Sequence, residues 1–269
     1  MKKVFLNTYI LVTLFLLNSS AFSILYEDGG THTIDYRIKY FETVYIDQNV
    51  RDAQTHVILA SGGIADNDVW CFGKSKFTSE GGYLRNTLRL LDNSTGILQE
   101  GIIGDSYLTQ NSTLEINGGE IQDDIILFDN AQVVVNGGEI GFEPSTGYKR
   151  GIQATENSLV TVNGGSIKGL LAGHRDNGPY DTSTIQVVGN GFKLNGSNIN
   201  AGQYYASDFT PDSLGYIGTL SGTLASGETI NSEIYIYDGS CLHLVPEPAT
   251  FSLFTLGAML AVRKGKSRE

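Results

Sequence analysis

The chain is poor in basic residues and has no long amphipathic helical pattern. Its 269 residues include 18 lysines and arginines against 29 aspartates and glutamates, a formal charge of −11. This shortage of positive charge disfavours electrostatic binding to nucleic acid or to an anionic membrane surface, so we expect no nucleic-acid partner. With 33 glycines, five prolines and no helical periodicity, the composition predicts an all-β chain.

Cysteine is also scarce. Cys71 and Cys241 are the only two in the sequence, and they lie 170 residues apart. They are compatible with an oxidising compartment and with one disulfide bridge, but two unrelated free thiols fit the sequence at least as well. The chain has no CxxC motif and no metal-ligand spacing. We therefore predict neither a metal site nor a cofactor.

What the chain has in abundance is one repeated motif. The tripeptide Asn-Gly-Gly recurs at steps of 19 and 27 residues, as Asn117-Gly118-Gly119, Asn136-Gly137-Gly138 and Asn163-Gly164-Gly165. Glycines continue the spacing of about 19 residues toward the N-terminus, at Gly101, Gly82 and Gly63. A fixed period with tolerated insertions indicates a stack of repeated coils.

Each repeat predicts a strand followed by a turn. Alternating apolar residues precede the motif and form two columns, Leu114, Val133 and Val160 in one and Ile116, Val135 and Val162 in the other. This alternation is typical of strands with one buried face. Asn-Gly-Gly then turns the chain, since asparagine tolerates a left-handed backbone and glycine adopts positive φ freely. Stacking would bring the three asparagines into register, where their amides can pair. We predict a right-handed single-stranded parallel β-helix over residues 24–194, in preference to a sandwich or a propeller.

The rest of the chain is less regular. Leu25 to Ala53 is expected to form a cap and irregular first coils, and Leu88 to Leu91 is predicted to begin a coil. Loop-rich insertions are predicted at Phe142 to Lys149 and at roughly Gly169 to Tyr180. Residues 195–244 lose the period, and we expect their strands to close the C-terminal end.

The two ends predict export. Met1 to Ser23 combines two lysines, an apolar stretch and a small-x-small sequence, which is typical of a secretory signal. At the other end, Pro246-Glu247-Pro248 precedes an apolar run and a basic terminus, Arg263, Lys264, Lys266 and Arg268. As a helix, residues 249–262 would span roughly 21 Å, less than the roughly 30 Å of a bilayer core. A marginal span with a positive end predicts a transient anchor in the inner membrane.

This tail resembles the PEP-CTERM sorting domain of Gram-negative bacteria, over about the last 25 residues. The resemblance implies that Pro246, Glu247 and Pro248 are recognised by an exosortase, a membrane-embedded cysteine protease or transpeptidase. It also implies that the basic terminus is a cytoplasmic stop, and that the producing cell often makes exopolysaccharide. The hydroxyl groups of Thr250, Ser252 and Thr255 depart from the family pattern by weakening the apolar span.

The sequence leaves two functional interpretations. Parallel β-helices host polysaccharide lyases and glycoside hydrolases, and Asp105 with Asp123 or Asp124 would supply paired carboxylates on neighbouring coils. Arg175, in the loop sequence His174-Arg175-Asp176, would supply the basic residue. The preferred interpretation is that these are ordinary polar residues and that the chain is not an enzyme. We expect an exported structural or adhesive protein of the cell surface or extracellular matrix, in contact with exopolysaccharide.

Overall fold

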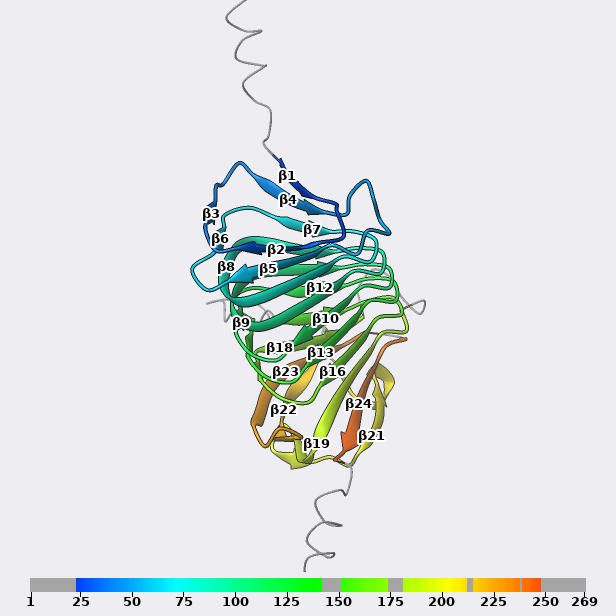
Figure 1. The fold of residues 1–269 in the computed structure, drawn as a ribbon. Coiled ribbons are helices and arrows are strands. Elements are labelled where there is room, and N and C mark those ends of the chain that lie inside the picture. The colour runs from blue at the N-terminus through cyan, green and yellow to red at the C-terminus, as the bar shows by residue number, and fades with distance from the viewer. Residues whose placement is uncertain (1–22, 142–150, 174–180, 212–214, 238, 248–269) are drawn as a thin grey trace, which may run out of the picture.

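The computed structural model describes residues 23–141, 151–173, 181–211, 215–237 and 239–247. These residues form a stack of coils made almost entirely of β-strands, with the two described ends of the chain at opposite ends of the stack (Figure 1). Their only helical element is a short 3-10 helix, η2 (Ala206–Asp208). The predicted all-β class is confirmed. The predicted signal and membrane helices lie outside the described residues.

The parallel strand pairs fall on three faces of the coil. Face A comprises β2 (Thr31–Ile34), β5 (His56–Ala60), β10 (Thr113–Ile116), β13 (Gln132–Val135), β16 (Leu159–Val162), β19 (Thr184–Leu194) and β24 (Cys241–Pro246). Face B comprises β3 (Arg37–Ile38), β6 (Ile64–Ala65), β11 (Glu120–Ile121), β14 (Glu139–Ile140) and β17 (Ser166–Ile167). Face C comprises β1 (Ser23–Tyr26), β4 (Thr43–Ile46), β7 (Val69–Cys71), β12 (Ile125–Leu127), β15 (Ile152–Ala154), β18 (Gly169–Ala172) and β23 (Thr229–Ile236). Two long strands, β8 (Lys76–Leu90) and β9 (Thr95–Leu108), run through all three faces.

The predicted apolar columns exist and are in register. On face A, Leu114 pairs with Val133 and Val133 with Val160, at the steps of 19 and 27 residues read from the sequence. The second column, Ile116, Val135 and Val162, pairs in the same way. All six side chains are buried. Because the strands of neighbouring coils lie about 4.8 Å apart, these columns merge into one core that runs through the stack.

Two sequence-based assignments are wrong. Leu88-Arg89-Leu90 does not begin a coil, because it is the end of β8 and completes a coil on face C, where Leu88 and Leu90 are buried. Gly169–Ala172 is not part of a loop insertion but strand β18. Its Leu170 and Ala172 stack on Ile152 and Ala154, so burial of the apolar side chains decides the structure there. Residues 142–150 and 174–180 lie outside the described residues.

The two ends of the stack differ. At the C-terminal end, β19 extends into antiparallel pairings with β20 (Ser197–Asn198) and β22 (Tyr216–Leu224). The chain then returns to the stack. β23 pairs parallel with β18 and antiparallel with β22. β24 pairs parallel with β19 and antiparallel with β21 (Gly202–Tyr205). At the N-terminal end, the expected cap of irregular coils over residues 25–53 is also wrong, because β1 to β4 pair with β4 to β7 in the same three-face order as the later coils. The described strands β1, β2 and β3 each pair on one side only.

Candidate functional site

Four outward side chains of face C line up across consecutive coils. Tyr45 pairs in register with Trp70, Trp70 with Arg89, and Arg89 with Tyr107. They point outward because their strand neighbours, such as Val69 and Cys71 around Trp70, are buried in the core. Phe72 follows directly after β7 and is buried. We call Tyr45, Trp70, Phe72, Arg89 and Tyr107 the aromatic surface.

The aromatic surface is tightly stacked. The ring centroids of Tyr45 and Trp70 are 6.1 Å apart, and those of Trp70 and Phe72 are also 6.1 Å apart with the rings 21° from parallel. The Arg89 guanidinium carbon lies 4.8 Å from the Trp70 centroid and 5.0 Å from the Tyr107 centroid. Arg89 is therefore a cation between two aromatic rings, an arrangement that fixes a flexible side chain.

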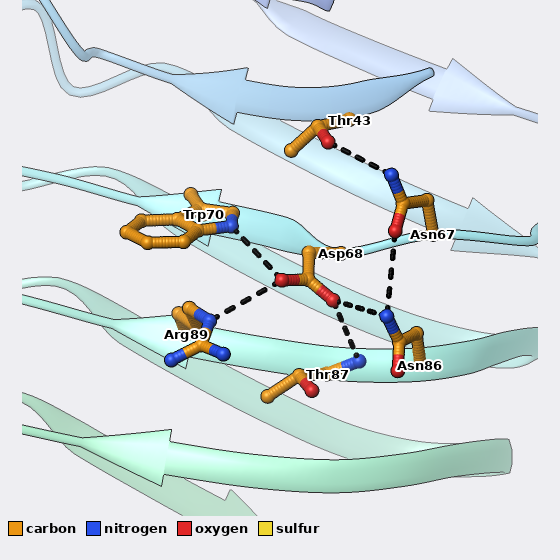
Figure 2. Close-up of polar contacts among 7 residues, drawn as sticks. All are labelled: Thr43, Asn67, Asp68, Trp70, Asn86, Thr87 and Arg89. Atoms are coloured by element: carbon orange, nitrogen blue, oxygen red, sulfur yellow. Dashed lines mark hydrogen bonds and ion pairs between the residues drawn. The ribbon is translucent and has the colours of Figure 1, made fainter. Parts of the chain in front are cut away.

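Asp68, just before β7, holds this arrangement in place (Figure 2). Its Oδ2 accepts hydrogen bonds from Trp70 Nε1 and Arg89 Nε, both at 3.3 Å. Its Oδ1 accepts from Asn86 Nδ2 at 2.6 Å and from the Thr87 backbone N–H at 3.3 Å. The carboxylate thus balances the charge of Arg89 and sets the orientation of the tryptophan ring.

Amide side chains extend the polar part of the site. Asn86 Nδ2 also donates to Asn67 Oδ1 at 3.3 Å, and Asn67 Nδ2 donates to Thr43 Oγ1 at 2.9 Å (Figure 2). The aromatic rings and this amide row share one region of the stack, on four consecutive coils. Partly exposed rings beside amide and carboxylate groups offer stacking and hydrogen bonding to a ligand. The sequence interpretation missed this site because no residue type repeats along its outward column.

The predicted carboxylates lie on adjacent coils and accept hydrogen bonds from backbone N–H groups. Ser106 pairs with Ile125, so Asp105 and Asp124 stand on adjacent coils as predicted. Asp105 Oδ1 accepts from the Asp124 backbone N–H at 3.4 Å, and Asp124 Oδ1 accepts from the Gly151 N–H at 2.8 Å. Asp123 lies in the bend between β11 and β12. The described residues contain no group of three side chains able to hold a metal ion. His174, Arg175 and Asp176 lie outside the described residues.

The predicted turns form a side-chain ladder. Asn136 Nδ2 donates to Asn117 Oδ1, and Asn163 Nδ2 donates to Asn136 Oδ1, both at 2.9 Å. Positive φ occurs at the second glycine of each motif, at Gly119, Gly138 and Gly165. The expectation that the asparagine is suited here by a left-handed backbone is wrong. None of the three asparagines has a positive φ, and their amide pairing accounts for the residue type.

A second ladder was not predicted. The corner residues Asp92, Gln110, Asp129 and Glu156 have left-handed φ values of 55–62°. Each side chain accepts a hydrogen bond from the backbone N–H of the corner one coil earlier, as in Gln110 N–H to Asp129 Oδ2 at 2.9 Å and Asp129 N–H to Glu156 Oε2 at 2.6 Å. An acid or amide directly before each Asn-Ser or Asn-Ala corner is the signal that would have identified it.

The predicted sorting residues begin at the end of β24, the last described strand. Pro246 is the last residue of β24, and the Glu247 N–H donates to Gly189 O at 3.2 Å. Asn190 Nδ2 donates to Glu247 Oε1 at 3.1 Å. Pro248, the predicted span 249–262 and the basic residues Arg263, Lys264, Lys266 and Arg268 lie outside the described residues. No helix in the described part of the chain is long and apolar enough to cross a membrane.

The cysteines are free thiols. Cys71 on β7 and Cys241 on β24 are both buried and unbridged. Burial raises the pKa of the Cys71 thiol far above its ordinary range.

Comparison with known proteins identifies neither the fold nor the site, since no protein-family model, curated protein or solved structure matches the chain.

Proposed function

We propose that the chain is an exported, exosortase-sorted protein with a structural or adhesive role at the cell surface or in the exopolysaccharide matrix of a Gram-negative bacterium. Residues 1–23 act as the signal peptide, and residues 245–269 act as the sorting signal with a transient span in the inner membrane. The body is a right-handed parallel β-helix, the hand that strand connections of this kind almost always take. It is not an enzyme.

The supporting observation is that β24, the last described strand, ends at the motif. Pro246 and Glu247 still contact β19, through the Glu247 N–H to Gly189 O and Asn190 to Glu247 Oε1. Removal of the chain beyond the Pro246-Glu247-Pro248 motif would therefore leave every described strand and its pairings in place. A motif that directly follows the last described strand suits a sorting signal that is cut off after export.

The experiment replaces Pro246-Glu247-Pro248 by three alanines in the producing cell. We expect the wild-type protein to lose its C-terminus, as seen by mass spectrometry of the native protein, and the variant to remain in the membrane fraction with Glu269 intact. The matched control is Asn190→Ala, which removes the contact to Glu247 but leaves the motif, and it should be processed normally. Normal maturation of the triple-alanine variant would remove the sorting assignment.

The aromatic surface supports the association with exopolysaccharide. Sugar rings present C–H groups that pack on aromatic rings, and their hydroxyls bond to amides and carboxylates such as Asn86 and Asp68. Asp68 balances Arg89, and the whole chain has a formal charge of −11, so the surface has no excess positive charge for a polyanion. We therefore propose a neutral glycan as the ligand of this surface.

Trp70 is the only tryptophan in the chain, so intrinsic fluorescence reports on this surface directly. We expect a neutral β-glucan hexasaccharide to shift Trp70 emission and protect it from acrylamide, and a hexagalacturonate of equal length to do neither. Tyr107→Ala should weaken the response. Tyr83→Ala is the matched control, because Tyr83 also lies beside an arginine, with Arg85 5.5 Å from its ring, but on face B. An unchanged Trp70 signal with every neutral hexasaccharide tested would contradict the glycan assignment.

The alternative function is a polysaccharide lyase or glycoside hydrolase. The one observation that favours it is the alignment of Asp105 and Asp124 on adjacent coils. The test is release of new sugar ends from neutral and acidic polysaccharides by the wild-type protein and by the double variant Asp105→Asn, Asp124→Asn. We expect no release from either protein. Release that the double variant abolishes, with the fold intact by circular dichroism, would establish the enzyme instead.

A further inference from the structure

The N-terminal end of the stack is open. Strands β1, β2 and β3 are each paired on one side, with β4, β5 and β6, and no described strand pairs with their outer edges. At the opposite end, both edges of β23 and of β24 are paired. An open edge presents a row of backbone donors and acceptors that favours pairing with another chain.

Exposed apolar side chains gather at this same end. Of the six large hydrophobic residues that the described structure leaves exposed, five lie between residues 25 and 50: Leu25, Tyr36, Tyr40, Phe41 and Val50. Phe41 is 74% exposed and Tyr40 69%, and their rings touch edge to face at 5.8 Å. The loops before and after β4, which hold Tyr40, Phe41 and Val50, stand beside β1 at the N-terminal end of the stack (Figure 1). We call these five residues and the outer edges of β1, β2 and β3 the end surface.

The core itself is incompletely covered here. Ile24 and Tyr26 on β1 pack against the core cluster but stay partly exposed, whereas Val44 and Ile46, their partners on β4, are fully buried. The difference arises because β4 has a coil on both sides and β1 has a coil on one. A further layer placed on β1 would bury the side chains of Ile24 and Tyr26 as the stack buries those of β4.

We propose that the end surface binds a second copy of this chain, joined end to end about a two-fold axis. At the C-terminal end, β22 and β21 cover the parallel strands β23 and β24, so a second copy cannot continue the parallel stack there and the assembly stops at two. The predicted signal cleavage after Ser23 would leave Ile24, the second residue of β1, as the start of the exported chain, with no preceding residues to cover the edge. Charges of both signs flank the surface, including Arg37 with Asp66 and Lys74 with Asp52, so two copies meet without a block of like charge.

The area is sufficient for a specific dimer. An aromatic side chain has roughly 200 Å² of surface, so the exposed fractions of Tyr36, Tyr40 and Phe41 leave roughly 400 Å². Leu25 and Val50, each nearly half exposed, bring the apolar surface to roughly 500 Å² per copy. Two copies would bury about 1,000 Å² before backbone contacts are counted, which is the size at which specific interfaces begin.

The experiment measures the mass of the exported, processed protein by sedimentation equilibrium over a range of concentrations. We expect a dimer that dissociates on dilution. Phe41→Glu should raise its dissociation constant about thirtyfold or more, as expected for an aromatic at the centre of an interface. Tyr205→Glu is the matched control, because Tyr205 is the remaining exposed large hydrophobic residue and lies on β21 at the other end. It should leave the mass unchanged.

A cysteine pair tests the geometry. Both native cysteines are buried, so Leu25→Cys would carry the one accessible thiol. Mild oxidation should link two copies of Leu25→Cys and should not link copies of Tyr205→Cys. A monomer at all concentrations would overturn the proposal, as would a dimer that Phe41→Glu leaves intact. So would a monomer whose end surface binds lipid vesicles, because the partner would then be a membrane. Signal processing and tail cleavage do not depend on the dimer, so failure of the dimer proposal would leave the proposed sorting function standing.

Discussion

Comparing alanine substitutions at Gly138 and Gly62 isolates the free-energy cost of adding a side chain where two coils lie close together. Both lie at corners between face A and face B, and their φ values are +91° and +89°. A Cβ on Gly138 would lie 2.9 Å from the carbonyl oxygens of both Gly118 and Gly119 on the neighbouring coil. A Cβ on Gly62 would meet nothing within 4 Å. Alanine at each position therefore adds the same backbone strain but a different contact.

The expected magnitudes follow from that geometry. Placing alanine at a left-handed φ costs about 1–2 kcal/mol, and this applies to both variants. At Gly138 the new methyl group must also be accommodated, and the coils cannot separate because β13 and β14 are paired on both sides. Overpacking of this kind costs about 1–3 kcal/mol. We expect Gly62→Ala to lower the free energy of unfolding by about 1–2 kcal/mol, and Gly138→Ala by about 2–5 kcal/mol.

The assay is urea unfolding followed by far-ultraviolet circular dichroism, with the two variants and the wild type side by side. Gly227→Ala is a second control, because Gly227 has φ +90° and nothing within 4 Å but lies in the turn between β22 and β23. It should resemble Gly62→Ala. Equal losses for Gly138→Ala and Gly62→Ala would refute the reasoning, since the second glycine would then be fixed by its φ alone and not by the neighbouring coil.

Three further predictions concern the ladder and two titrating groups. Asn136→Ala removes two amide bonds whereas Asn163→Ala removes one, so urea unfolding should show about 1–3 kcal/mol lost for the former and half of that for the latter. Burial raises the pKa of Cys71 above its ordinary 9.0, so stability is complete below pH 9 and falls as the pH rises beyond it. Urea midpoints measured from pH 7 upward should show this loss, and Cys71→Ala should lack it. Burial, with Lys76 nearby, lowers the pKa of His56 below 6.5, so its contribution is present above pH 6.5 and is lost as the pH falls below that value. His56→Gln should flatten the urea midpoint between pH 7 and pH 5 relative to the wild type.

The sequence predicted the parts of the coil in which a given position accepts only one kind of residue. The apolar columns of face A repeat as leucine, isoleucine or valine, since only such side chains fill the core, and the amide ladder repeats as Asn117, Asn136 and Asn163. The second glycine repeats because its φ is positive and a backbone lies close to it. Where one position of the coil requires one residue type, the spacing of that residue in the sequence reports the length of the coil.

The parts that escaped prediction are those in which several residue types satisfy one geometry. The left-handed corners accept aspartate, glutamine or glutamate, because each can receive a backbone N–H from the neighbouring coil. Face C was missed as a third strand because its short apolar runs, such as Ile125–Leu127, carry no flanking motif. The return of β23 and β24 to the stack depends on contacts with residues about 60 positions away, which no local pattern reports.

The location of the aromatic surface is not explained by the stack itself. Further along face C the same outward column continues from Tyr107 as Ile126, Gln153 and Leu171, and these three coils stack without rings or arginine. An aromatic residue returns to the column at Tyr235, which is buried and lies beside Tyr216. The stacked rings with an arginine between them lie on coils near the N-terminal end, which is also the end proposed to join two copies. A dimer would carry two glycan-binding surfaces, and a polymer that reaches both would be held more tightly by the second contact.

We therefore expect the Phe41→Glu variant to bind a neutral hexasaccharide as the wild type does, measured by Trp70 fluorescence. On the corresponding polysaccharide gel it should be retained at least about tenfold less strongly than the wild type. Equal retention of both proteins on the gel would mean that the two surfaces never act together.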